Sequence, residues 1–399
     1  MKKILVLFIC SLITFNTLAA DDLSLIDLFG EEENKQDENS QKKSQETNVQ
    51  QSKNDKEGEL NDQTQTSDSE QNSKISDFFS FLNIPFFRSQ DALKQQELSP
   101  NKNEPQESYE QRLIKMAESG DVDACLTLGY LYLFGENGIK KDEKQAFKYY
   151  SIAAEKNDII ALNNLGSLYY SGIGTKKNIT EATKLFEKAT QLGNYESGVN
   201  LAFIYLTQNS TLDASQRSTI VRLFNQAAEA DNIIAQYMMG MVYYNGFGIT
   251  KNDIKAFNYM QQAAREYDEA QYKLAQMYIN AYGTTRNYKK GIDNLIKSAK
   301  QGNVKAMILL GDILSEGKNY PKNEYDAYIW YNIASVSNPS EAIEKRDETE
   351  KKLKIEEVLQ AQAAAETFKP APSEITTYVR RTFGQNIDKY LTQTKAQNF

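Results

Sequence analysis

Residues 161–190 read ALNNLGSLYYSGIGTKKNITEATKLFEKAT, and residues 235–264 read AQYMMGMVYYNGFGITKNDIKAFNYMQQAA. Each stretch contains two runs in which apolar residues recur at helical spacing, joined by a turn that contains glycines. Because the same arrangement recurs along most of the chain, this pair of runs decides the fold.

The first run follows the pattern small-x-x-x-(Leu/Met)-(Gly/Ala)-x-x-Tyr. Its sixth position recurs every 35 to 38 residues, at Gly129, Gly166, Ala202, Gly240, Ala275 and Gly311. A period of this length is typical of stacked helix pairs, each of which buries its apolar face only against its neighbours. The small residue lets the two helices of a pair approach closely. We expect the tyrosine three residues later, such as Tyr169 or Tyr243, to fill a wedge in the core.

The second run carries a marker residue, in most units alanine, followed three or four residues later by a large apolar side chain. The large side chains are Tyr150, Phe186, Phe224, Tyr259, Leu295 and Trp330. Four residues before the marker stand Asp142, Asn178, Asn252, Asn287 and Asn323, which are residue types that cap a helix N-terminus. The third unit has Gln216 at this position and lacks the turn glycine, so it should be the irregular one.

These patterns predict an all-α, right-handed solenoid of six helix pairs over residues 107–369. A leading half repeat, Tyr109 to Glu118, should open the solenoid. Capping helices between Glu341 and Phe368 should close it, with Leu353, Val358 and Leu359 on their inner face. The tail, residues 370–399, has room for one short helix around Tyr378 to Tyr390, where a dimer contact is an option.

The register resembles the Sel-one-like repeat (SLR) family, a branch of the tetratricopeptide-type helical repeats. The family pattern of Ala-x-x-x-Leu-Gly-x-x-Tyr-x-x-Gly-x-Gly, a capped turn and an Ala-rich second helix is legible in both quoted stretches. The resemblance implies a protein that acts as an adaptor in protein assemblies, in bacterial members often in the envelope or in host interaction. Some exported relatives carry paired cysteines in each repeat, and this chain lacks that pattern.

The N-terminal region predicts export. Lys2 and Lys3 precede an apolar run, and small residues at Thr17 and Ala19 suit a signal peptidase, so residues 1–19 are a predicted secretory signal. An uncleaved membrane anchor is the alternative. Residues 20–74 form an acidic, Gln-rich segment with too few apolar side chains to fold, which predicts a disordered tether. Residues 75–106 contain an apolar patch and a linker.

Composition limits the chemistry. The 399 residues include 46 Lys+Arg and 54 Asp+Glu, a net charge of -8, which disfavours nucleic acid as the main partner. The chain has no histidine and only two cysteines, so catalytic triads, His-liganded zinc and Cys-rich metal sites are excluded. We expect no cofactor, no metal and no enzyme activity. Cys125 should be a buried, unreactive thiol.

The favoured function is an exported envelope scaffold, located in the periplasm or at the outer membrane, surface-exposed or secreted, that binds an envelope or host protein. An envelope glycan- or peptide-acting enzyme that uses carboxylates is the alternative. The first helices should line a concave groove, whose predicted binding residues are Tyr130, Asn163, Ser167, Tyr170, Phe203, Tyr237, Met241, Tyr244, Tyr272 and Gln276. Packing of this stripe against neighbouring first helices is the competing interpretation. A second predicted docking patch is Phe78, Phe79, Phe81, Phe86 and Phe87, which either docks elsewhere, including peripherally on a membrane, or packs on the solenoid. The oligomeric state stays open.

Overall fold

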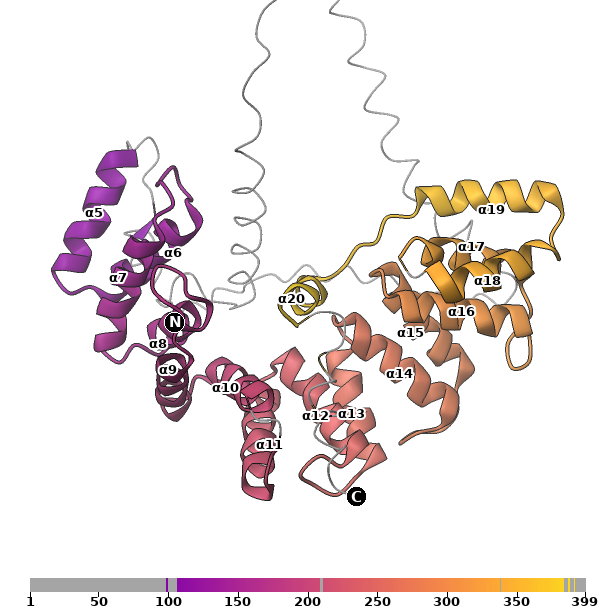
Figure 1. Cartoon of the computed structure of the whole chain (residues 1–399), viewed down its shortest axis with the longest axis horizontal. Coiled ribbons are helices and arrows are strands. Elements are labelled where there is room, and N and C mark those ends of the chain that lie inside the picture. Colours follow the sequence, from indigo (N-terminus) through magenta and orange to yellow (C-terminus); the bar gives the residue numbers. More distant parts are fainter. Residues whose placement is uncertain are drawn as a thin grey trace, which may run out of the picture.

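The computed structural model describes residues 98–99, 106–208, 211–337, 339–383, 387 and 391. The predicted signal, the tether and the Phe-rich patch all lie outside these residues. Every regular element in the described part is an α-helix, and none of these helices is long and apolar enough to cross a membrane. Figure 1 shows the helices following one another along an arc, with α5 at one end and α18 and α19 at the other.

The helices alternate as first and second members of pairs. A leading helix, α5, spans Gln106–Glu118. The six pairs that follow are α6 (Val122–Phe134) with α7 (Glu143–Glu155), α8 (Ile159–Ser171) with α9 (Ile179–Gln191), α10 (Tyr195–Gln208) with α11 (Ala214–Glu229), α12 (Ile233–Asn245) with α13 (Asp253–Ala263), α14 (Asp268–Asn280) with α15 (Tyr288–Lys300), and α16 (Val304–Glu316) with α17 (Glu324–Ser335). Each of these helices packs on the one before and the one after it. The predicted all-α solenoid of helix pairs is confirmed.

The predicted caps start the second helices. Asp142, Asn178, Asn252, Asn287 and Asn323 each have extended backbone angles and accept hydrogen bonds from backbone N–H groups of the first turn. Such a cap is worth about 1 kcal/mol, because it satisfies a donor that the helix itself leaves unpaired. At the other end of the first helices, Gly135, Gly172, Gly246 and Gly317 take left-handed angles that suit glycine.

The third unit is irregular, as predicted. Its second helix, α11, starts after Asp213, whose side chain accepts from the N–H of Gln216, while the Gln216 side chain accepts from the N–H of Asp213. Gln216 is therefore the third helical residue rather than the cap. As a result α11 has 16 residues, whereas α9 in the regular second unit has 13.

The small residues of the first helices face the second helices. A Cβ on Gly166 would lie 2.9 Å from Phe186, and one on Gly311 would lie 2.6 Å from Tyr331. In the fourth unit Met260 meets Gly240 in the same way. The side chain that packs on the small residue therefore stands four residues after the marker, which selects Met260 and Tyr331 rather than the adjacent Tyr259 and Trp330.

The tyrosine wedge is only partly internal. Tyr132 and Tyr278 are buried, and Tyr169 and Tyr243 pack against the core but keep part of their surface exposed, so the two predicted wedge residues lie at the edge of the core rather than inside it. Tyr243 instead stacks on Tyr259 with ring centroids 5.8 Å apart. The position holds an aromatic ring beside the helix pair, at the edge of the core.

Two helices close the solenoid. They are α18 (Pro339–Glu350) and α19 (Ile355–Thr367), and both pack on α17. Val358 and Ala361 are buried, as the cap prediction requires, and Phe368 meets Trp330 edge to face. Leu359 is 59% exposed, so its predicted place on the inner face is wrong.

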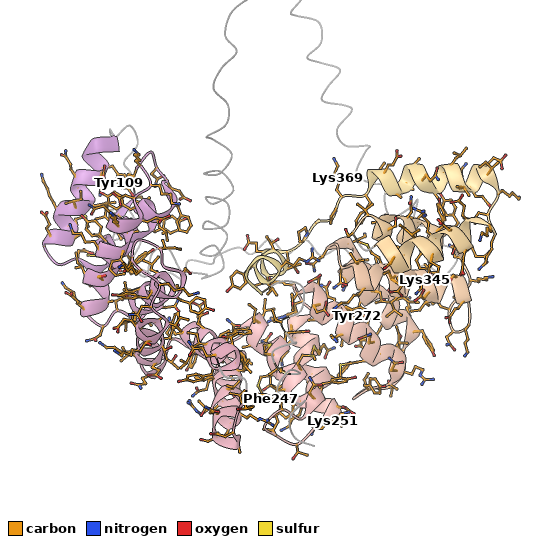
Figure 2. All side chains as sticks on the ribbon, viewed as in Figure 1. Tyr109, Phe247, Lys251, Tyr272, Lys345 and Lys369 are labelled. Carbon is orange, nitrogen blue, oxygen red and sulfur yellow. The ribbon has the colours of Figure 1, made fainter. Side chains whose placement is uncertain are left out.

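The chain then turns back. From Lys369, which Figure 2 labels at the end of α19, an extended segment leads to the helix α20 (Glu374–Phe383), which lies inside the arc. The helix begins four residues before the predicted one. It packs on the connections between second and first helices, whereas Phe247 and Lys251 of the α12–α13 loop lie at the outer edge (Figure 2).

Candidate groove between the first helices

The predicted groove residues separate into two groups by burial. Five are buried: Asn163, Ser167, Phe203, Tyr237 and Met241. Five are partly exposed: Tyr130, Tyr170, Tyr244, Tyr272 and Gln276. The second group offers surface to a partner, and of the buried group only Met241 lines the pocket described below, so the expectation that Tyr237 and Phe203 are surface anchors is corrected.

The buried members hold neighbouring units together. Asn163 Oδ1, on α8, accepts hydrogen bonds from Ser197 Oγ at 2.8 Å and from Asn200 Nδ2 at 3.1 Å, both on α10. Tyr237 on α12 meets the Tyr267 ring edge to face at 5.0 Å. At these positions the competing interpretation, that the stripe packs between first helices, is the correct one.

A pocket of about 230 Å³ remains between the first helices α12 and α14. It is lined by Met241, Tyr244, Met260, Lys273, Gln276, Met277, Asn280 and Tyr282. Three predicted groove residues, Met241, Tyr244 and Gln276, therefore meet at one place. Tyr170 and Tyr130 lie on earlier first helices, away from the pocket lining.

Aromatic and amide groups give the pocket mouth its chemistry. The rings of Tyr244 and Tyr282 meet edge to face at 6.2 Å, and Tyr282 is 42% exposed. The ammonium group of Lys251 lies 5.3 Å above the Tyr244 ring, and Lys177 holds Tyr170 in the same way at 5.2 Å in the second unit. These cation–π contacts leave the rings oriented for a further apolar contact.

Tyr272 borders the same face of α14. Its hydroxyl accepts a hydrogen bond of 2.9 Å from Gln276 Nε2, and Lys305 lies 6.0 Å from its ring centroid. Burial, with Glu269 nearby, raises the pKa of Tyr272 to about 12. The phenol therefore stays protonated at neutral pH and can serve a partner as a hydrogen-bonding group.

Sequence reasoning missed five of the eight lining residues. Met260 and Met277 stand at positions that pack within the helix pairs, and Tyr282 stands in the turn after α14, where other units have a different residue type. Lys273 and Asn280 follow on the α14 face that carries Gln276. The signal available was the α14 sequence itself, which is the most polar of the first helices.

Three further predictions concern Cys125, metal ligands and the Phe-rich patch. Cys125 is buried, and burial raises the pKa of its thiol to about 11, as an unreactive thiol requires. No group of three metal-ligating side chains occurs among the described residues. The predicted patch at Phe78, Phe79, Phe81, Phe86 and Phe87 lies outside them, so its docking role stays a prediction.

The repeat of this chain matches a known family of helical repeats. The Sel1 repeat model matches residues 122–158, 159–194, 233–268, 268–303 and 304–335, and passes over the irregular third unit. The Sel1-repeat-containing protein YjcO of Escherichia coli K12 is 30% identical over 166 residues, which are 41% of this chain and 68% of that protein. The HRD3B component of an ERAD-associated E3 ubiquitin ligase of Arabidopsis thaliana is 33% identical over 110 residues, 27% of this chain and 17% of that protein.

Two solved structures are similar to this chain. A Sel1 repeat protein from Oxalobacter formigenes is 28% identical, with a TM-score of 0.49 over 57% of this chain and 92% of that one. The antigen c5321 of uropathogenic Escherichia coli, which displays an SLR fold, is 24% identical, with a TM-score of 0.47 over 70% of this chain and 68% of that one. The repeat matches and the shared length with YjcO show that this chain belongs to the Sel1-like repeat family.

Proposed function

We propose that the protein is an exported adaptor that binds a segment of a protein partner between α12 and α14. The observation that carries this proposal is the pocket at Met241, Tyr244 and Gln276. Tyrosine and methionine are favoured at protein interfaces, because they offer large apolar area with a polar or polarisable end. Sel1 repeat proteins generally mediate protein–protein interactions. The relative HRD3B, for example, is named as a component of a ubiquitin ligase.

The size of the pocket favours a side chain as its occupant. Sites for small molecules and cofactors usually measure about 300–1,000 Å³. A pocket of about 230 Å³ with an open mouth suits one large side chain of a bound segment. The rest of that segment would then run over the exposed parts of Tyr272 and Tyr282.

The lining favours binding over catalysis. Among the described residues that form the pocket, none is an aspartate or a glutamate. Hydrolysis of a glycan by carboxylates needs two such groups facing the same bond. The pocket therefore supports the scaffold rather than the enzyme alternative.

Export is the part of the proposal that rests on residues 1–19 alone. A variant without these residues should remain in the cytoplasm when the full chain reaches the envelope fraction. Equal distribution of the two chains would remove the envelope from the proposal and leave the adaptor role intact.

Site-specific crosslinking tests the groove. A photo-reactive amino acid at Tyr282 should capture one defined partner from envelope fractions of the producing cells. Tyr195, which is 45% exposed against 42% for Tyr282, provides a control site of the same residue type and similar exposure on α10. Capture from position 282 should fall at least tenfold when Tyr244→Ala is added, and Tyr195→Ala should leave it unchanged. Equal capture from positions 195 and 282 would contradict the groove.

A further inference from the structure

The corner between α13 and α14 departs from the repeat. Five of the six first helices begin after an aspartate or asparagine that accepts a hydrogen bond from the N–H three residues on: Asp121, Asp158, Asn194, Asn232 and Asn303. In the fifth unit Tyr267 stands there, and its side chain makes no capping hydrogen bond. The next residue is Asp268, where the other units have Val122, Ile159, Tyr195, Ile233 and Val304.

The C-terminal helix supplies a different acceptor to this corner. The N–H of Asp268 donates to Thr376 Oγ1 at 3.1 Å, across 108 residues of sequence. Arg380 Nη2 lies 2.6 Å from Asp268 Oδ2, so the carboxylate that replaces an apolar residue is paired. The Asp268 side chain is 5% exposed and Thr376 is fully buried, which makes these contacts well shielded from water.

The neighbouring corner, between α15 and α16, receives the same segment. Gln301 Oε1 accepts from the N–H of Ser373 at 3.0 Å and from Thr376 Oγ1 at 2.6 Å. The N–H of Ala371 donates to the carbonyl of Lys300 at 2.9 Å. A Cβ on Gly302 would lie 2.9 Å from Pro370 Cβ, so the absence of a side chain there makes room for the segment.

The contact has the character of a bound peptide. It joins a ten-residue helix, too short to be stable alone, to two corners through hydroxyl, amide and charge contacts. Tyr378 and Val379 add apolar area, because they are buried in the same cluster as Tyr237 and Tyr267. A cavity of about 30 Å³, room for one water molecule, remains between Tyr267, Gly302 and Arg380. In contrast to α20, each helix of the repeats packs on the other helix of its own pair.

We propose that the two corners form a peptide-recognition site, that α20 is its resident ligand, and that a helix of a partner protein with the same face competes for it. That face carries a hydroxyl at the N-cap, a threonine three residues later and an arginine seven residues later, as Ser373, Thr376 and Arg380 do. The site goes beyond the proposed function, because it lies at the N-terminal end of α14 and the Tyr244 pocket lies farther along that helix. Either can be wrong without the other.

A labelled peptide of residues 369–391 tests the site on the full-length protein. In wild type the resident helix should keep the peptide out. Arg380→Glu weakens the resident helix and leaves the site intact, so the peptide should bind this variant at least tenfold more tightly than wild type. Adding Asp268→Lys removes the pairing carboxylate and should abolish the gain.

A matched arginine controls for charge reversal. Arg346 has the same side-chain exposure as Arg380, 27%, and pairs with Asp347 outside the site. Arg346→Glu should bind the peptide as weakly as wild type. If wild type, Arg346→Glu and Arg380→Glu all fail to bind the peptide, α20 is a permanent joint and the proposal is wrong. If all three bind it tightly, the peptide binds elsewhere on the protein, and the proposal is wrong in that case too.

A glycine pair provides a variant that leaves the site's polar groups unchanged. Gly302 and Gly193 stand at equivalent positions, with φ of +88° and +96°, so alanine strains both. Only at position 302 does the new Cβ meet Pro370, whereas nothing lies within 4 Å of it at position 193. Gly302→Ala should speed hydrogen exchange of the Asp268 amide at least tenfold over Gly193→Ala. Equal exchange rates in the two variants would count against the idea that α20 can be displaced from the corners. If the wild-type protein is a dimer whose two chains exchange their tails, the competing helix comes from a second copy of the chain, and the proposal of a partner protein is wrong.

Discussion

The second and fifth units have the same architecture but are completed in different ways. In the second unit Asp158 caps α8, Asn178 caps α9 and Gly172 ends α8, so the unit satisfies its own helix ends. In the fifth unit Tyr267 offers no cap, Ala281 takes the left-handed angle with φ of 60°, and Thr376 of the distant tail receives the first N–H group. In the fifth unit, therefore, the lapse in the repeat coincides with a contact to a distant segment, whereas the irregular third unit still caps α11 with its own Asp213.

The largest effect that can test this comparison lies in the core of the regular unit. Phe186, 2% exposed, packs on the backbone of Gly166, so Phe186→Ala should lower the free energy of unfolding by about 3–5 kcal/mol. Tyr169 in the same unit keeps part of its surface, and Tyr169→Ala should cost only about 1–2 kcal/mol. Urea denaturation measures both. Equal losses would mean that the tyrosine position is core after all.

An intermediate effect separates the two ways of capping. Asp158→Ala removes a local cap and should reduce the global free energy of unfolding by about 1 kcal/mol. Thr376→Ala should instead speed hydrogen exchange at Asp268, with little change at Ile160 and Ala161. Exchange that rises equally at both helices in either variant would show that the corners are not independent.

The smallest effect concerns pH in the irregular third unit. Burial raises the pKa of Glu196 to about 7 from its usual 4.5, so folding favours the protonated carboxyl group. This contribution is complete below pH 4.5 and is lost as the pH rises through 7. Because the side chain is partly exposed, the loss should be about 1 kcal/mol or less.

Thermal unfolding at about pH 5 and about pH 8 measures that loss, and Glu196→Gln should reduce the difference between the two melting temperatures. Glu181→Gln is the control, because this acid in the first turn of α9 pairs with Lys184 at the surface. A pH difference that survives Glu196→Gln unchanged would place its origin elsewhere.

The sequence predicts well what each unit does for itself. The period, the caps from Asp142 to Asn323 and the irregular third unit follow from residue types at short spacing, and all are present in the structure. It predicts less well which of two adjacent residues faces inward, since a helix turns about 100° per residue and Met260 and Tyr259 are both large. Burial of the groove stripe depended on how closely neighbouring units stack, and the position of Tyr237 shows that they stack closely.

The docking of α20 could not be predicted, because its partners lie more than 70 residues away in sequence. The receiving side nevertheless left a trace in the sequence. Glu266, Tyr267 and Asp268 interrupt the succession of Asp or Asn followed by an apolar residue at the other corners. Such an interruption in one repeat is a useful signal of a long-range contact.

The segment from Pro370 to Arg380 also has a mechanical consequence. A stack of helix pairs behaves as a spring, because each unit can rotate slightly on the next. The segment forms hydrogen bonds with the α13–α14 corner and with the α15–α16 corner at once. It therefore connects two successive corners of the solenoid and restricts their relative motion. Tension along the arc would therefore stretch the units from α5 to α11 first, and the part between the two corners would yield only when the contacts of this segment with Asp268, Gln301 and Lys300 break.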